Sequence, residues 1–503
     1  MNNMTICQCQ VNAHGQRQLE LDVTYPLTTD EKRNCYQLDL FIFNPYQLGM
    51  TKKNYGVSHF LRDLRTYTRY TIPLISLQTL ADASCAISPI TRISDMLSQS
   101  DMAKDLDEKT ILYELRVIAN VYQRQLVDTS ILISNLIHDH GPSVHITDHL
   151  QSFLSDIDLF LETFRALCSR FIDPRVSDLL RESLRWSDES ISLSTEKTQH
   201  KLYNLCRQQK NLEQAGAILE NRLDLEQSYR IAMGYPTVTQ PDNSVVNELF
   251  VYREGMLKKW TEGCLFMSTE PARIAARFTQ VLMGVAAGTA MAFAIVATFF
   301  AIKWFPTYSM EWAILIIIGY IAKDRIKEIL RNIFISHLPR FVADQIEDLM
   351  DPAIDVNVGS SRTRVRFCCP SDLSNSIQHL RNIEGNVFRN IIPPENVIHF
   401  HKDTLIDSKR ILQNHKRLES ITEIMRLKLD SWLANMDDPM NELFSISDGK
   451  RTKVMADRVY HLNIVISLSE KKKHGKGASL FRYRLILTRQ GIIRIEHMQS
   501  LSA

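Results

Sequence analysis

The stretch FTQVLMGVAAGTAMAFAIVATFFAI, residues 278–302, decides how the rest of the chain is organised, because it contains no charged residue. As an α-helix it would extend about 37 Å, which is enough to cross a hydrocarbon core roughly 30 Å thick with some tilt. A buried helix of a soluble protein seldom runs this far without a charge. The stretch therefore predicts a membrane-spanning helix over 278–302.

A shorter apolar segment, WAILIIIGYIA, follows at 312–322. It reaches the length of a span only if 306–311 enters one membrane interface and Lys323 extends its amine to the other. Aromatic residues typical of such an interface lie between the two segments, namely Trp304, Phe305, Tyr308 and Trp312. The sequence thus predicts a two-helix transmembrane hairpin with spans at 278–302 and 306–322.

Basic residues flank this hairpin on both sides, whereas its short connection carries only Lys303. The positive-inside rule therefore places both flanks, and both termini, in the cytoplasm. The prediction is a multi-pass protein of the cell inner membrane with two spans. The flanking residues are Arg253, Lys258, Lys259, Arg273 and Arg277 before the hairpin and Lys323, Arg325, Lys327, Arg331 and Arg340 after it.

Gly284, Gly288 and Ala292 recur at every fourth position in the first span. Small residues on one stripe of a helix let another helix approach closely. Two partners fit this stripe at the level of sequence: the second span of the same chain, or a second copy in a homo-oligomer. No ionisable residue lies in mid-span, which argues against ion-coupled transport.

Outside the membrane region the patterns predict an α+β protein that is mostly helical. Residues 18–25 and 36–43 alternate polar and apolar side chains and predict an N-terminal β-hairpin. Since the membrane hairpin returns the chain to its starting side, the N- and C-terminal β segments are hypothesised to share one cytoplasmic sheet. The C-terminal segments, a predicted three-stranded meander, are 460–468, 480–487 and 491–497. The predicted domains are 1–95 (α/β), 96–240 (helical bundle or coiled-coil-like), 241–340 (membrane) and 341–503 (α+β).

Long amphipathic helices are predicted between the two β regions. Residues 111–137 and 149–172 have apolar side chains at helical spacing. Leu205, Leu212 and Leu219 follow one another at intervals of seven, so 196–233 predicts the seam of a coiled coil or bundle. The sequence GYPTVTQPDN at 234–243 then predicts a linker before the membrane region.

The composition of the 503 residues excludes several classes of protein. A formal net charge of +2 offers no electrostatic basis for direct nucleic-acid binding. Nine cysteines without paired CxxC motifs fit reduced thiols. The motifs of phosphate-binding loops, dinucleotide-binding folds and nucleophile elbows are absent from the sequence. We therefore predict no cofactor and no enzymatic activity.

The strand-like stretch SRTRVRF carries Arg362, Arg364 and Arg366 on one face. Three neighbouring guanidiniums repel one another unless an anion or an acidic partner screens them. They therefore predict a site for a phosphate-rich ligand or a lipid headgroup. The alternative is a solvated edge strand whose charges prevent aggregation.

Residues 112–141, LYELRVIANVYQRQLVDTSILISNLIHDHG, resemble the opening of an HD-domain phosphohydrolase through His138 and Asp139. The resemblance implies a metal site in which this His-Asp pair joins an upstream histidine and a later aspartate. Tyr113 or Glu114 stands where the upstream histidine would fall, so such a site is incomplete. We therefore predict no metal site, with His138 and Asp139 as the candidates if one exists.

The two-span architecture at 278–322 is similar to that of transmembrane effectors of bacterial anti-phage systems, such as those tied to retrons. The resemblance implies a membrane-anchored cytoplasmic sensor and effector whose hairpin assembles through Gly284, Gly288 and Ala292 and perturbs the inner membrane in antiviral defence. Its partners would be membrane lipids, a cytoplasmic protein or ribonucleoprotein, and further copies of the chain. Two alternatives stay open: a membrane tether or scaffold for a cytoplasmic partner, and a degenerate metal-dependent phosphohydrolase.

Overall fold

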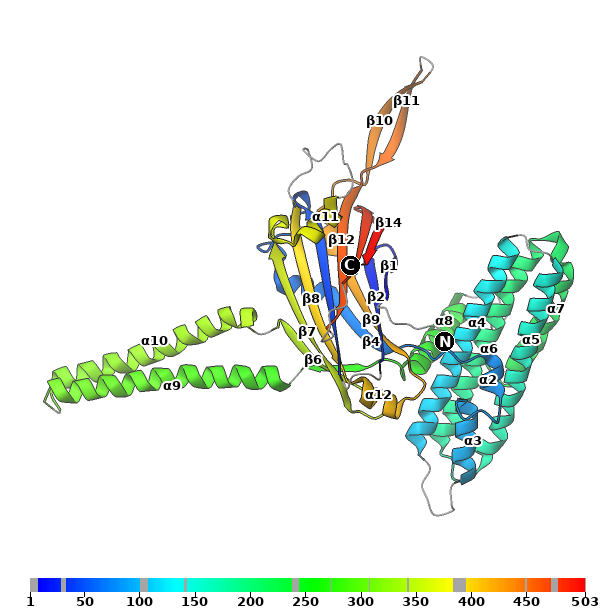
Figure 1. The fold of residues 1–503 in the computed structure, drawn as a ribbon, viewed down its shortest axis with the longest axis horizontal. Coiled ribbons are helices and arrows are strands. Elements are labelled where there is room, and N and C mark those ends of the chain that lie inside the picture. Colours follow the sequence, from blue (N-terminus) through cyan, green and yellow to red (C-terminus); the bar gives the residue numbers. More distant parts are fainter. Residues whose placement is uncertain are drawn as a thin grey trace.

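The computed structural model describes residues 8–28, 33–99, 107–139, 143–237, 244–271, 273–306, 308–341, 343–382, 395–447, 450–471 and 478–502. Two β-sheets lie at the centre, a helical bundle stands on one side of them, and a helical hairpin projects on the other (Figure 1). The chain is 53% helical and 28% strand, which confirms the predicted mixture of α and β structure.

The larger sheet joins strands from both ends of the chain. Ile42 of its central strand lies opposite Ile464 on one side and Ile398 on the other. The hypothesis that the N- and C-terminal β regions share a sheet is therefore confirmed, as is the C-terminal meander. In spatial order the strands are β14 (Gly491–Ser502), β13 (Ser479–Thr488), β12 (Tyr460–Glu470), β3 (Asn34–Pro45), β8 (Glu395–Ile406), β7 (Asn357–Cys368), β6 (Gln345–Met350) and β5 (Ser268–Pro271), with every neighbouring pair antiparallel.

The smaller sheet shows that the predicted N-terminal hairpin is wrong. Strand β2 pairs with β1 and β9, whereas β3, the other half of that prediction, lies in the larger sheet. Alternating side chains make a strand bury one face, but they do not specify which strand it pairs with. The spatial order is β1 (Gln8–Ala13), β2 (Gln18–Pro26), β9 (Ser420–Lys428) and β4 (Leu64–Tyr70).

The two sheets pack face to face around a shared core. Tyr25 of the smaller sheet stacks on Tyr36 of the larger one, with 4.8 Å between ring centroids. Lys402 and Glu423 form an ion pair between the sheets, and their side chains are only 3% and 1% exposed. Tyr25 also donates a hydrogen bond to Glu423 over 3.1 Å. Removing either charge would leave the other buried and unpaired, so the pair favours one alignment of the two sheets.

The helical bundle is an insertion between β4 and β5, and the sandwich holds both of its ends. The Tyr70 backbone N–H donates to the Leu265 carbonyl over 2.9 Å, and the Met267 N–H donates to the Thr68 carbonyl over 2.8 Å. The helices of this region are α2 (Leu77–Ala81), α3 (Pro89–Gln99), α4 (Glu108–His138), α5 (Ser143–Ala166), α6 (Asp178–Arg207), α7 (Glu213–Ala232) and α8 (Ser244–Glu262).

The predicted helices of the bundle are only partly correct. Helix α4 contains the predicted 111–137, but α5 ends at Ala166 and a 3-10 turn continues to Ile172. The predicted coiled-coil or bundle seam over 196–233 is divided between two helices, because α6 ends at Arg207 and α7 begins at Glu213. Leu212 lies in the turn between them and is buried with Leu219, so the leucine repeat lines the core of a bundle. Residues 238–243 of the predicted linker lie outside the described residues.

The helical hairpin is inserted between β5 and β6, where a turn of a β-hairpin would otherwise stand. Because Pro271 lies opposite Glu347 in this pair, the chain leaves and re-enters the sheet at neighbouring positions. Helices α9 (Arg273–Trp304) and α10 (Met310–Phe341) lie side by side and extend away from the sandwich (Figure 1). The two ends of the helical hairpin thus lie close together at the edge of the larger sheet.

Only α9 is long and apolar enough to cross a membrane among the described helices, through the 25 residues Gln280–Trp304. The predicted second span at 306–322, and with it the hairpin of two spans, does not meet that criterion. Helix α10 begins at Met310, but its apolar run lies between Glu311 and Lys323 and extends only about 16 Å, well short of a hydrocarbon core roughly 30 Å thick. The structure therefore has a helical hairpin with one candidate span.

The remaining elements extend or cap the sandwich. A two-stranded ribbon, β10 (Met440–Ser447) with β11 (Lys450–Asp457), projects from it (Figure 1). Ile377 and Leu380 of α11 pack on the outer face of the larger sheet at one end. The short helices are α1 (Gly56–Asp63), α11 (Asn375–Asn382), α12 (Ser408–Asn414) and α13 (Asp430–Leu433).

Candidate anion and metal site

The arginines of the predicted anion site lie together on the outer face of the larger sheet. Along β7 the side chains of Thr363 and Val365 are buried in the core, whereas Arg362, Arg364 and Arg366 face the other way. In the part of the chain that the structure describes, none of the three guanidiniums has a carboxylate within ion-pair distance. Their charge is therefore available to a ligand or to solvent.

Strands β8 and β3 add histidines and an aspartate beside this row. In the strand register Arg364 lies opposite His401, and Arg366 lies opposite His399. On the other side of β8, Asp39 of β3 lies opposite His401. The sheet therefore brings polar side chains from three strands, far apart in sequence, onto one patch of its outer face.

Asp39 is hydrogen-bonded to both imidazoles. Its Oδ1 lies 2.8 Å from His399 Nε2 and 2.7 Å from His401 Nδ1. The second ring nitrogen of His401 lies 3.1 Å from Asp403 Oδ2, and Lys471 Nζ donates to Asp403 Oδ1 over 3.0 Å. A carboxylate at each nitrogen of His401 stabilises the protonated ring.

The pKa values of the cluster follow from these contacts. The hydrogen bond to Asp39 is the main reason that the pKa of His401 is raised above its usual 6.5, although burial opposes it. Burial by itself would raise the pKa of Asp39, but the hydrogen bonds from His399 and His401 outweigh it and hold that pKa well below 3.8. The ordinary state at neutral pH is thus an ionised Asp39 beside a ring that readily holds a second proton.

Asp39, His399 and His401 also offer three metal-ligand atoms, all within 4.8 Å of one another. Imidazole nitrogens and a carboxylate oxygen are the donors of three-ligand zinc sites. The His399 ring is held in place by Phe41, on which it stacks with a centroid distance of 4.3 Å and an interplanar angle of 10°. The donors are therefore pre-positioned on rigid strands.

His138 and Asp139, the candidates from the HD-domain resemblance, do not lie in this cluster. His138 is the last residue of α4 and Asp139 caps its end, and both side chains are exposed. Glu114, near the position of the missing upstream histidine, lies about 36 Å away along the same helix. Among the described residues, neither His138 nor Asp139 belongs to a group of three metal ligands.

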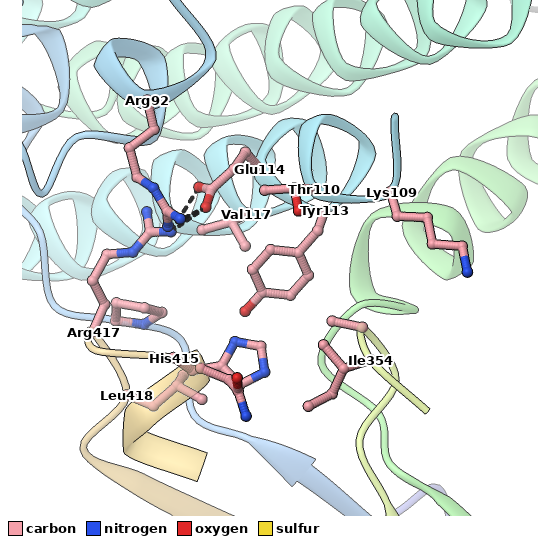
Figure 2. A pocket seen from close by; sticks show the side chains of 13 residues that line it. Arg92, Lys109, Thr110, Tyr113, Glu114, Val117, Ile354, His415, Arg417 and Leu418 are labelled. Atoms are coloured by element: carbon pink, nitrogen blue, oxygen red, sulfur yellow. Dashed lines mark hydrogen bonds and ion pairs between the residues drawn. The ribbon is translucent and has the colours of Figure 1, made fainter. Parts of the chain in front are cut away.

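Glu114 instead lines a pocket of about 210 Å³ where the bundle meets the sandwich. Figure 2 shows its carboxylate between the guanidiniums of Arg92 and Arg417. Arg92 Nη1 lies 2.5 Å from Oε1, and Arg417 Nη2 lies 2.5 Å from Oε1 and 2.7 Å from Oε2. Because the Glu114 side chain is 1% exposed, this is a buried ionic joint between α4 and the segment after α12.

A second network lies behind the same pocket. His415 Nε2 and the Tyr70 hydroxyl both lie within hydrogen-bond distance of Asp351 Oδ2, at 2.7 and 2.6 Å. Burial alone would raise the pKa of Asp351, but these two hydrogen bonds more than offset it and lower the pKa. The Tyr113 ring, whose hydroxyl points toward His415 in Figure 2, has its pKa raised by burial. The polar groups here satisfy one another and hold the two parts together.

The small-residue stripe faces away from α10. Gly284, Gly288 and Ala292 are all exposed, and a Cβ placed on either glycine would meet nothing within 4 Å. The contact with α10 is made on the opposite side of α9, where Ala286 and Ala290 are each 1% exposed. Of the two partners that the sequence left open, the second helix of the same hairpin does not occupy this stripe.

Sequence reasoning missed Asp39, His399, His401 and Asp403 as a group. The signal for three of these four residues was present in NVIHFHKD at 396–403, because two histidines and an aspartate at every second position share one face of a strand. No comparable signal in the sequence indicated Asp39, since its place opposite His401 depends on a pairing between residues more than 350 positions apart.

Comparison of the chain with protein-family models, curated proteins and solved structures produced no match. The site is therefore interpreted from its own chemistry.

We predict that His401 titrates above pH 6.5 and that Asp39→Asn lowers its midpoint. Because the pKa of His401 is higher in the folded than in the unfolded state, its interaction with Asp39 stabilises the fold fully at pH values below the unfolded-state pKa. This stabilisation is lost as the pH rises through the folded-state pKa. The wild type should therefore exceed Asp39→Asn in melting temperature most clearly between about pH 4 and 6.5, and progressively less as the pH rises through the raised pKa of His401. NMR titration and thermal melts measure both. A difference that grows toward alkaline pH would contradict the assignment.

We predict that Glu114→Ala lowers the free energy of unfolding by about 3–5 kcal/mol, because it leaves two guanidiniums facing each other at a buried joint. Glu114→Gln, which keeps an acceptor, should cost less. Asp128→Ala breaks an exposed pair with Arg124 on the same helix and should cost less than about 1 kcal/mol. Denaturant melts of the three variants test this order. Equal losses in Glu114→Ala and Asp128→Ala would contradict the buried joint.

Proposed function

We propose that the protein is a membrane-anchored sensor and effector whose α9/α10 hairpin inserts into a bilayer while the sandwich and the bundle stay on one side. The observation that carries the proposal is the bare apolar surface of α9, since only 17% of its candidate span is buried. An apolar surface of this length is costly in water, at about 25 cal/mol per Å². A bilayer would cover it, and the chain itself does not.

The lengths of the two helices support a particular position in the bilayer. A Cβ placed on Gly319 would lie 3.4 Å from the Ala297 Cβ, so these two residues are level with each other. One turn nearer the sheet, Lys323 of α10 is then level with Phe293 of α9. Beyond that level both helices are apolar for about 15 Å, up to Lys303 and Glu311, whereas nearer the sheet only α9 is apolar. The far half of the hairpin is thus apolar on both helices, whereas the half nearer the sheet is apolar on α9 and charged on α10. We call the charged part of α10, which begins at Lys323, the charged shoulder.

The charged shoulder on α10 also supports assembly. Asp324 and Arg325 have side chains that are 69% and 76% exposed, and contact with lipid tails would be unfavourable for both. Helices of neighbouring copies would shield such residues from lipid. The stripe of Gly284, Gly288 and Ala292 offers the surface on which a second α9 could pack closely. We therefore include self-association of α9 in the proposal.

The effector form of the proposal, including a role in anti-phage defence at the cell inner membrane, requires that assembled hairpins make the membrane leak. The bundle and the sandwich would then receive a cytoplasmic protein or ribonucleoprotein as the trigger. A tether or scaffold is the alternative function, and it needs the membrane anchor without any leak.

We predict that Phe293→Arg with Val296→Arg removes the protein from membranes. Both side chains are exposed on α9, at 42% and 51%, so the fold tolerates the change, while each arginine costs about 2.5–3.5 kcal/mol in mid-membrane. The matched control is Phe444→Arg with Ile446→Arg on the exposed β10–β11 ribbon, which should stay membrane-bound. Flotation of cell membranes on a density gradient separates the outcomes. Flotation of both variants like the wild type would refute insertion through α9.

We predict that Gly288→Ile reduces cross-linking between copies in membranes roughly tenfold, which corresponds to about 1.4 kcal/mol. Thr289→Ile places the same isoleucine side chain at an exposed position outside the stripe and should cross-link like the wild type. In cells, a potential-sensitive dye should report depolarisation with the wild type and Thr289→Ile but not with Gly288→Ile. Undiminished cross-linking of Gly288→Ile would contradict assembly through the stripe, and intact membrane potential in all three would favour the tether.

A further inference from the structure

We propose that the outer face of the larger sheet binds a divalent transition-metal ion, with Zn²⁺ as the natural probe, through Asp39, His399 and His401. We further propose that Arg364 and Arg366 hold an oxyanion such as a phosphate monoester at the open position of the metal. The inference stands apart from membrane anchoring, because it rests on a face of the sandwich that the hairpin does not form.

The donor geometry is close to that of a zinc site. In a tetrahedral complex with bonds of about 2.0–2.1 Å, the ligand atoms lie roughly 3.3 Å apart. Here Asp39 Oδ1 lies 2.8 Å from His399 Nε2 and 2.7 Å from His401 Nδ1. These side chains need to spread by only about half an ångström when a metal ion replaces the shared protons. Three protein ligands leave a fourth position open, as in catalytic zinc sites.

The surroundings of the donors are those of a metal site. A histidine that ligates a metal through one ring nitrogen usually donates the other N–H to a carboxylate, which fixes the ring and makes it a stronger ligand. Asp403 stands in that position, 3.1 Å from His401 Nε2, and Lys471 holds Asp403 over 3.0 Å. Phe41 fixes the plane of the second imidazole by stacking. Both histidines are thus oriented by their own supports.

The arginine row determines the class of ligand at the open position. Arg364 and Arg366 are the strand neighbours of the two histidines, so their guanidiniums repel a bare metal ion. An oxyanion that bridges the metal and the guanidiniums removes this repulsion, and guanidinium is well suited to hold phosphate by paired hydrogen bonds. Metal and oxyanion should therefore bind with positive coupling, each raising the affinity of the other.

The competing explanation is that protons alone hold the cluster together, with a cationic His401 between Asp39 and Asp403. It accounts for the hydrogen bonds but assigns no role to Arg364 and Arg366, which form no ion pair with the described residues. The two explanations differ in whether the purified protein binds metal and in whether an oxyanion changes that affinity.

The first test is Zn²⁺ titration of the full-length protein in detergent, followed by calorimetry and thermal melting. We expect one strong Zn²⁺ site per chain. The double variant His399→Ala with His401→Ala should lower the Zn²⁺ affinity at least 100-fold. Asp403→Asn removes no ligand and should weaken binding about 10–100-fold. The control His145→Ala with His149→Ala removes an exposed helical pair and should bind like the wild type. Wild-type affinity in both sheet variants, or its loss in the helical control alone, would overturn the metal site.

The second test repeats the titration with phenyl phosphate. We expect phenyl phosphate to raise the Zn²⁺ affinity of the wild type by roughly tenfold, and Arg364→Ala with Arg366→Ala to abolish this gain while Zn²⁺ still binds. Phenyl phosphate that binds equally well with and without Zn²⁺ would show an arginine site independent of the metal. An unchanged Zn²⁺ affinity in all proteins would overturn the oxyanion part of the proposal.

Discussion

Antiparallel pairing at the points where the chain leaves and re-enters the sandwich is the constraint on which the rest of the structure depends. Residues 265–267 bind the edge of β4 and so close the insertion that forms the bundle, while β5 pairs with β6 and closes the one that forms the hairpin. Closing a loop costs free energy that grows only slowly with its length, so each insertion can be large without weakening the sheets. The four residues of β5 lie in the chain between α8 of the bundle and α9 of the hairpin, so the sheet edge separates the two insertions.

Buried ion pairs fix the relative positions of the parts in the same way. Lys402 and Glu423 join the two sheets, and Glu114 joins the bundle to the sandwich through Arg417, while Arg92 binds Glu114 from within the bundle. Such pairs are weak sources of stability but are costly to misalign, because a displaced partner leaves a buried charge unpaired. The outer face of the larger sheet differs from these joints, since its three arginines form no ion pair with a carboxylate of the described residues. That surplus of positive charge, next to an Asp-His-His cluster, is the observation on which the proposed ligand site rests.

Local patterns predicted individual elements better than their partners. The apolar stretch at 278–302 and the alternation along 460–497 each led to the correct element, because helix and strand formation depend on which face a short segment must bury. The same alternation at 18–25 and 36–43 led to a wrong hairpin, since β2 and β3 bury their faces in one core from opposite sheets. The leucine repeat at 196–233 identified the buried face but not the turn at 208–212. His138 and Asp139, the pair on which the HD-domain resemblance rests, lie on the surface at the end of a helix.

The sequence by itself determined that a mixed α+β protein contains one long apolar helix, and that Arg362, Arg364 and Arg366 share a strand face. Both follow from the periods of helix and strand and from the cost of exposing apolar groups to water. Only the tertiary structure decided which strands meet, which side of α9 packs against α10, and that Asp39 stands beside His399 and His401. The strand pairings join residues that are up to hundreds of positions apart, where many registers satisfy the local pattern and only packing of the complete core selects one. The face of α9 that meets α10 depends on how two neighbouring helices pack together, which the pattern of either helix does not specify.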